Sequence, residues 1–228
     1  GLPIGEIDSN EKIKAKLFLK LENNKEEVST EFPYIQDKIP TEEGTGFVYT
    51  GFHFDTTYHE EQRVYAMGAF DICRSYMRQF RQDPNFKGIL SEIDYLKPYF
   101  DIFPEDRETM IKAFKDGRAE ADVFYNQPNE VSISGEGLVR NLIYGQLFHG
   151  KVLGRKCLIY SPGDVFGHPA QLSQIVTKGG CEGIGWDKYI LGFPPLFWHI
   201  SPDGTMLLHR RGNVSYEEAH QMGISSYL

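Results

Sequence analysis

Cysteine, positive charge and long apolar runs are all scarce in this sequence. Its three cysteines, Cys73, Cys157 and Cys181, are an odd and unclustered set, which excludes a disulfide framework or a zinc knuckle. Acidic residues outnumber Lys and Arg by 32 to 24, which gives a formal net charge of −8. No basic run occurs, so nucleic acid and anionic membranes are poor candidate partners. No apolar run approaches the length of a membrane span.

Aromatic residues are the abundant class. Tyr and Phe number 13 and 16 among 228 residues, a length that suffices for one sizeable domain or two small ones. Aromatic rings suit a carbohydrate site, where they stack on sugars, although large cores use them too. The composition therefore admits a sugar ligand without requiring one.

Residues 1–45 differ from the rest of the chain. Apolar residues alternate with polar ones between Ile13 and Leu21, which predicts a half-exposed strand. The sequence that follows, to Gly46, is rich in Glu and contains Pro, which is typical of a linker. We therefore expect residues 1–45 to form an N-terminal strand and linker appendage, and residues 46–228 to form the main domain.

In residues 46–228, segments with strand and helix patterns alternate. Apolar runs predict buried strands at 47–52, 88–92, 119–125, 157–160 and 183–186. Helical spacing predicts helices at 59–83, 95–103, 104–117, 135–149 and 169–178. In the helix 135–149 we expect Leu138, Leu142 and Leu147 to face inward. The turn 201–204 predicts a hairpin of 196–200 and 205–209, and Ser215 with Glu218 predicts a last short helix. This alternation predicts an α/β fold of parallel βα units.

Polar side chains follow the C-terminal end of each predicted strand, the edge at which α/β proteins build active sites. These residues are His53, Asp55, Glu92, Asn126, Gln127, Asp164 and Asp187. His53 and Asp55 are two residues apart, so on an extended strand their side chains point the same way. A nitrogen and a carboxylate aimed at one point suit a metal site or an acid/base pair. A strand-end histidine that hydrogen-bonds its neighbour explains the pair equally well.

A second candidate is the segment Asp164-Val-Phe-Gly-His168, between a predicted strand and a predicted helix. Gly163 and Gly167 allow a tight turn and a close approach of a ligand to the backbone. Asp164 would then stand at the rim of the sheet. Taken alone, the motif is better explained by an aspartate that satisfies backbone N–H groups at the start of the helix.

Taken in order, these motifs resemble glycoside hydrolase family 38, the α-mannosidases. His53, Asp55 and Tyr58 match the family's strand-end His-x-Asp with its following aromatic, and Asp164-Val-Phe-Gly-His168 matches its nucleophile motif. Intervening blocks also resemble the family, at Ser91–Glu92, Tyr95–Leu96, Gly117–Glu130 and Ser134–Arg140. The resemblance covers roughly residues 47–210.

The resemblance implies a (β/α)7 barrel domain, here incomplete and with an extra N-terminal strand and linker, and a retaining α-mannosidase that uses Zn²⁺. It implies that Asp164 is both a zinc ligand and the nucleophile, with His53 and Asp55 as further ligands. The implied substrate is a mannose-containing oligosaccharide or glycan. We expect this substrate to contact Tyr58, Glu92, Gln127, Phe166 and Trp186.

Two parts of the family's machinery have no counterpart in this sequence. A retaining hydrolase needs a second carboxyl group as acid/base, about 5 Å from the nucleophile, and the family's fourth zinc ligand is a histidine. In the family both lie well downstream of the nucleophile motif. We therefore expect them C-terminal to Leu228, in the rest of the same enzyme. The alternative is that Glu92, Glu130 or His209 serves locally.

Two other functions fit the same motifs. One is a catalytically incomplete or inactive carbohydrate-binding module of the same fold. The other is a metal-dependent carbohydrate deacetylase-like hydrolase, which has similar strand-end Asp and His ligands. That class also needs a His pair at helical spacing, and the sequence has none. Metal content and hydrolysis of an aryl α-mannoside separate the three.

Overall fold

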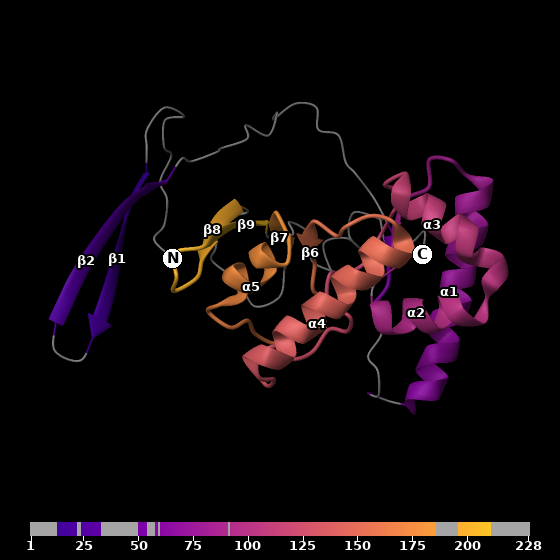
Figure 1. Cartoon of the computed structure of the whole chain (residues 1–228), viewed down its shortest axis with the longest axis horizontal. Coiled ribbons are helices and arrows are strands. Elements are labelled where there is room, and N and C mark those ends of the chain that lie inside the picture. Colours follow the sequence, from indigo (N-terminus) through magenta and orange to yellow (C-terminus); the bar gives the residue numbers. More distant parts are fainter. Residues whose placement is uncertain are drawn as a thin grey trace, which may run out of the picture. The chain divides into compact units, whose positions relative to one another are not determined.

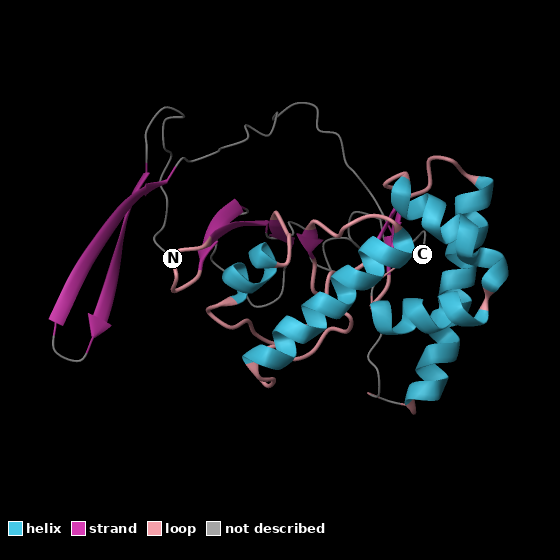
Figure 2. Ribbon diagram, viewed as in Figure 1, coloured by secondary structure: helices cyan, strands magenta, loops and turns pink. Residues whose placement is uncertain are grey.

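The computed structural model describes residues 13–21, 24–32, 50–53, 58, 60–90, 92–185 and 196–210, and for 13–21, 24–32 and 50 it describes the backbone alone. The chain divides into two compact units, Gly1–Val48 and Tyr49–Leu228 (Figure 1). Figure 2 shows that helices occur in the second unit, whereas the described part of the first is a pair of strands.

The first unit contains one β-hairpin. Strand β1, Ile13–Leu21, pairs antiparallel with β2, Asn24–Phe32, in a register that sets Ile13 opposite Phe32 and Leu21 opposite Asn24. The predicted strand is confirmed, but β2 occupies sequence that was expected to be linker. Its Glu-rich composition hid a run of β-formers around Val28 and Thr30, and pairing with β1 satisfies the backbone groups that face the partner strand.

Three helices form one end of the second unit (Figure 1). They are α1, Gln62–Gln82; α2, Ile93–Ile102; and α3, Arg107–Lys115, which follows a single 3-10 turn, η1, at Pro104–Asp106. Their apolar faces meet in a core whose fully buried members include Met77, Leu96, Tyr99, Met110 and Phe114. The predicted helices are confirmed here to within a few residues, because each carries apolar side chains at helical spacing.

The strands of the second unit form two sheets. In one, β3 (Thr50–Gly51), β4 (Gly88–Ile89) and β5 (Ala119–Glu120) run parallel in that order. In the other, the order is β6 (Ile159–Tyr160), β7 (Gly183–Gly185), β9 (Met206–Arg210), β8 (Leu196–Ile200). Strands β6, β7 and β9 are parallel, and β8 pairs antiparallel with β9, which confirms the hairpin. The described strands do not by themselves close into a barrel.

The strands are shorter than predicted. The expected strand 119–125 pairs only at Ala119–Glu120, after which the chain leaves the sheet. Just beyond, the Val123 N–H donates to the Asp122 carboxylate rather than to a neighbouring strand, at 2.7 Å. An apolar run marks burial, but it does not mark where strand pairing ends. The polar residues expected at the strand ends therefore lie in the irregular segments that follow β3, β4 and β5.

Helix α4, Gly135–Phe148, lies between the helical end and the second sheet, and runs on into a π-helical turn, η2, at His149–Leu153 (Figure 1). Ser134 caps it by accepting from the Gly137 N–H at 3.1 Å. Leu138 and Leu142 are buried as expected, but Leu147 is 41% exposed, so its predicted inward position is wrong. The inward position belongs to Gly145 instead, where an added Cβ would meet the Val123 carbonyl oxygen at 1.9 Å.

Helix α5, Leu172–Lys178, confirms the predicted helix and buries Leu172 and Val176 against the second sheet. The predicted strand residues 47–49 and the predicted last helix around Ser215 lie outside the described residues. Among the described helices, none combines the length and apolar character that crossing a membrane requires.

Candidate functional site

A pocket of about 390 Å³ lies where the extensions of β3, β4 and β5 meet the loop after β6. Its lining residues are mostly polar, and they are His53, Glu92, Asp94, Asn126, Gln127, Pro128, Asn129, Asp164, Val165 and Phe166. Parallel strands present their C-terminal ends at one edge, so residues distant in sequence meet there. The pocket therefore stands at the edge that the sequence pattern indicates.

His53 and Glu92 form a pair at the back of this pocket. His53 follows β3 and Glu92 follows β4, and the His53 Nδ1 lies 2.8 Å from the Glu92 Oε1. The Glu92 side chain is 3% exposed, whereas that of His53 is 31% exposed. Because a carboxylate accepts, the Nδ1–H donates to it and the Nε2 lone pair is directed elsewhere. This arrangement orients an imidazole for use as a ligand.

Gly163 brings the loop after β6 directly against the His53 ring. A Cβ added at Gly163 would lie 2.7 Å from the His53 Nδ1 and 2.8 Å from the Gln127 Oε1. The Gly163 N–H donates to the same Gln127 oxygen at 3.0 Å. The glycine is therefore required by close approach, and it brings the neighbouring Asp164 to the pocket beside His53.

Two carboxylate oxygens at the pocket have no hydrogen-bond partner among the described residues. Within the described part of the chain, Glu92 Oε2 and Asp94 Oδ1 are buried and make no hydrogen bond. Burial, and then the negative charge of Glu92, raise the pKa of Asp94 to about 7. Buried acceptors of this kind are costly unless a ligand completes them. With Asp164 also among the lining residues, the pocket favours a cation or a hydroxyl-rich ligand.

A further, almost fully buried carboxyl group interacts with residues of this site. Asp122 is 2% exposed, and burial raises its pKa well above the usual range, with the charges of Glu92 and Glu130 adding to the effect. Its backbone carbonyl lies 2.9 Å from the His149 Nε2. Burial lowers the pKa of His149, so this histidine is held neutral. Neither Asp122 nor His149 lines the pocket.

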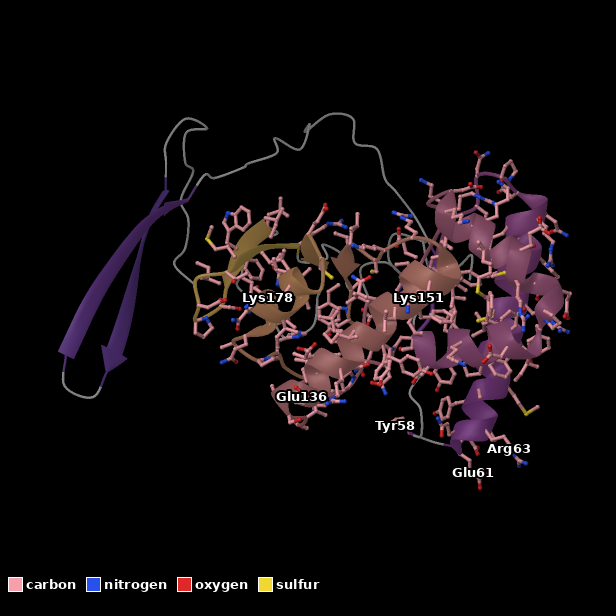
Figure 3. The ribbon with its side chains drawn as sticks, viewed as in Figure 1. Tyr58, Glu61, Arg63, Glu136, Lys151 and Lys178 are labelled. Carbon is pink, nitrogen blue, oxygen red and sulfur yellow. The ribbon has the colours of Figure 1, made fainter. Side chains whose placement is uncertain are left out.

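Six of the residues expected at the site line the pocket, namely His53, Glu92, Asn126, Gln127, Asp164 and Phe166. Tyr58 is not among the lining residues; it is 73% exposed and lies near Glu61 and Arg63 at the start of α1 (Figure 3). Asp55 and Trp186 lie outside the described residues.

The zinc set of His53, Asp55 and Asp164 stays a prediction. Among the described residues, no group of three His, Cys, Asp or Glu side chains could hold a metal ion. That search does not include Asp55, which is one of the three expected ligands.

Of the local alternatives for an acid/base, only Glu92 lines the pocket. The Glu130 side chain is fully buried, and His209 is 0% exposed with its ring stacked on Phe197 at 4.3 Å. Glu92 itself is engaged by His53 through one oxygen. Of the three, Glu92 alone therefore stays a local candidate for the acid/base, with one oxygen already used by His53.

Asp94 and Asn129 belong to the pocket but were not singled out from the sequence. Asp94 stands two residues after Glu92, the same spacing that drew attention to His53 and Asp55. It lies in the first turn of α2, where an acidic residue is common for helix-capping reasons alone. Because that ordinary explanation is sufficient, the sequence alone does not show that Asp94 also lines the pocket.

Comparison with known proteins gives a consistent result. A Halalkalibacterium halodurans protein provisionally named a mannosylglycerate hydrolase is 26% identical over 188 residues, which span 72% of this chain and 20% of that protein. Alpha-mannosidase G of Dictyostelium discoideum is 43% identical over 83 residues, or 33% of this chain and 8% of that one. This chain therefore spans about a fifth or less of the length of these relatives.

Solved structures show the same fold. An α-mannosidase from Enterococcus faecalis superposes with a TM-score of 0.65 at 22% identity, covering 72% of this chain and 19% of that one. A 4-α-glucanotransferase from Thermococcus litoralis gives 0.61 at 14% identity, covering 79% and 30%. The family model of the glycosyl hydrolases family 38 N-terminal domain matches residues 45–220. The chain therefore belongs to glycosyl hydrolase family 38, through the N-terminal domain of that family.

Proposed function

We propose that this chain is the N-terminal part of a zinc-dependent retaining α-mannosidase that hydrolyses terminal α-mannosides. The observation that carries the proposal is the convergence of His53 and Asp164 on one polar pocket, from strand ends far apart in sequence. Family membership supports glycosidase chemistry at this pocket. The domain would be a (β/α)7 barrel, to which β3–β4–β5 and β6–β7–β9 contribute parallel units.

The residues present fit a zinc ion. An imidazole nitrogen and carboxylate oxygens are the ligands that zinc takes in catalytic sites. His53 is oriented by Glu92, Gly163 allows a close approach, and Glu92 Oε2 and Asp94 Oδ1 leave negative charge at the pocket without partners among the described residues. His53, Asp55 and Asp164 would hold the metal. When bound, the ion would act as a Lewis acid toward sugar hydroxyls.

Asp164 would act as the nucleophile. Its carboxylate attacks the anomeric carbon, the bond to the leaving oxygen breaks, and a glycosyl-enzyme forms on Asp164. Water then releases the sugar with retained configuration. Both steps need a second carboxyl group about 5 Å away. We place this acid/base, and a further histidine ligand, C-terminal to Leu228, in keeping with the small fraction of each relative that this chain spans.

The remaining lining residues would bind the sugar. Gln127 offers an amide to sugar hydroxyls, and Phe166, which is 57% exposed, presents a ring on which a sugar face can stack. Glu92 is assigned mainly to orienting His53, because one of its oxygens is already used. Tyr58 and Trp186 stay predictions as further contacts.

The test uses the full-length enzyme and an aryl α-mannoside. Asp164→Asn should lower kcat by at least about a thousandfold, because the amide is not a nucleophile, while the thermal midpoint changes little. His53→Ala should reduce bound zinc measured by elemental analysis. Lys97→Ala, on the helical end, is the matched surface control and should leave both unchanged.

Each result has a contrary outcome. A wild-type enzyme without zinc, or one whose turnover is unaffected by Asp164→Asn, would overturn the proposal. A protein that holds zinc and binds mannosides without hydrolysing them would instead be the carbohydrate-binding module.

A further inference from the structure

One carboxylate outside the pocket is bonded on both sides by the segment that carries Asp164. Glu130 lies in the loop after β5, next to the pocket residue Asn129, and its side chain is fully buried. The Tyr160 hydroxyl donates to its Oε1. The His168 Nδ1 donates to its Oε2 at 2.9 Å. Both oxygens of one buried side chain are therefore occupied by the segment that runs from the end of β6 to His168.

The two donors stand at opposite ends of the segment 160–168. Tyr160 ends β6 and His168 closes the loop, with Asp164 in the middle. Gly167 has φ +150°, a conformation that favours glycine and lets the loop turn back toward Glu130. Between these ends, the Gly163 N–H donates to Gln127, which belongs to the same loop as Glu130. One loop thus holds the other at three points.

We infer that Glu130 is a positioning residue, which fixes Asp164 at the pocket by holding both ends of segment 160–168. This inference rests on the proposed function for the role of Asp164, but its geometry does not depend on a bound metal.

The surroundings make both bonds persistent. Tyr160 is 0% exposed and the His168 side chain is 3% exposed, so water does not compete for Glu130. Burial, and then the charge of Glu130, raise the pKa of Tyr160 well above its usual range, so its hydroxyl stays a donor. The rings of Tyr160 and His168 meet edge to face, at 6.4 Å and 85°.

The helical end supplies a matched control. The Tyr99 hydroxyl donates to Asp106, another buried carboxylate, and Tyr99 is also 0% exposed. Tyr99→Phe and Tyr160→Phe therefore remove the same bond from equally buried rings. Only the second bond adjoins the Asp164 segment. Glu130→Gln is the conservative variant, since its amide oxygen can still accept from Tyr160.

The first readout is NMR of the metal-free protein, which does not depend on activity. Tyr160→Phe should speed exchange of the Gly163 amide by roughly five- to tenfold, the worth of about one hydrogen bond. Tyr99→Phe should lower global stability by the same amount but leave the exchange rate of the Gly163 amide unchanged. Glu130→Gln should speed this exchange by less than Tyr160→Phe does. If Gly163 exchanges alike in Tyr160→Phe and Tyr99→Phe, Glu130 only stabilises the fold and the inference is wrong.

The second readout is Co²⁺ bound to the full-length enzyme, followed by its visible absorption. Tyr160→Phe should alter the spectrum and weaken binding on the order of tenfold, as loss of outer support for a ligand does, whereas Tyr99→Phe should do neither. A wild type that binds no Co²⁺ would count against the proposed zinc site alone, and the Gly163 exchange would still decide the role of Glu130. A bound ion whose spectrum Tyr160→Phe leaves unchanged would contradict that role.

Discussion

The helical end and the pocket both bury negative charge, but they treat it differently. Asp106, between α2 and α3, is 3% exposed and accepts from Tyr99 and Arg81 through its two oxygens. At the pocket, Glu92 Oε2 and Asp94 Oδ1 are buried without a hydrogen bond from the described residues. Burying a carboxylate is costly in either place. The chain offsets that cost internally at Asp106, whereas at the pocket the described residues do not offset it for these two oxygens.

The largest expected effect is on the helical side of this comparison. Asp106→Ala leaves the Tyr99 hydroxyl buried without an acceptor and removes the partner of Arg81. The free energy of unfolding, measured in urea, should therefore fall by about 3 kcal/mol. The part-exposed Arg81 reduces the loss relative to a fully buried pair. Metal binding at the pocket should be retained. A loss below about 1 kcal/mol would mean that Asp106 is not the internally compensated case.

Gly163→Ala should damage both stability and the pocket. The added methyl collides with the His53 ring and the Gln127 amide. Displacing these two side chains should lower the free energy of unfolding by about 1–3 kcal/mol. Zinc affinity, measured by competition with a chelator, should fall because His53 moves. Gly150→Ala has open space around the added methyl and serves as the control. Equal zinc affinity in the two variants would show that His53 is not a ligand.

Glu92→Gln should separate binding from stability. The free energy of unfolding of the metal-free protein should fall by less than about 1 kcal/mol, because the change removes a buried charge that is only partly compensated. Zinc affinity should fall roughly 10–100-fold, since the amide no longer fixes the His53 ring as the carboxylate does. Glu105→Gln, on the exposed side of the helical end, should change neither quantity. Stronger zinc binding in Glu92→Gln would reverse the assigned role.

The smallest expected effect is a pH dependence at Asp94. Its pKa is about 7 in the folded protein and 3.8 for an unperturbed aspartate. The folded state therefore holds a proton that the unfolded state releases. This contribution to stability is fully present below about pH 4 and is lost as pH rises to about 7. With a chelator present, the free energy of unfolding of Asp94→Asn should therefore rise relative to that of the wild type as the pH increases across this window. The expected change is on the order of 1 kcal/mol after solvent screening.

The control for this measurement is Asp101→Asn, whose carboxylate is exposed and paired with Lys97. It should follow the wild-type pH dependence. A constant difference between Asp94→Asn and the wild type from pH 4 to 8 would contradict the raised pKa.

Much of the fold could be predicted from local pattern. Helices α1 and α3 lie close to the predicted spans, because apolar spacing and the stop signals at Asp83 and Gly117 are written in the chain. Leu147 was misassigned because the inward face of α4 is set by contact of Gly145 with the Val123 backbone. The hairpin strand β2 was missed because its stability comes from pairing with β1 rather than from its own composition.

The site shows the same division. Motif order was sufficient to select His53 and Asp164, and both line the pocket. It did not identify Asp94, whose sequence context is that of an ordinary helix start. Nor did it show the role of Glu130, because the two donors to this side chain come from another loop.

The sequence by itself determined the alternation of strands and helices, because this follows from periodicity along the chain, and the order of its motifs resembled one family. Only the tertiary structure decided which residues of those motifs share a pocket, and which carboxylates keep a buried oxygen without a hydrogen bond from the described residues. Burial and hydrogen bonding depend on what each side chain meets across space. That is why Glu130 is internally bonded while Glu92 and Asp94, chemically alike, are left facing the pocket.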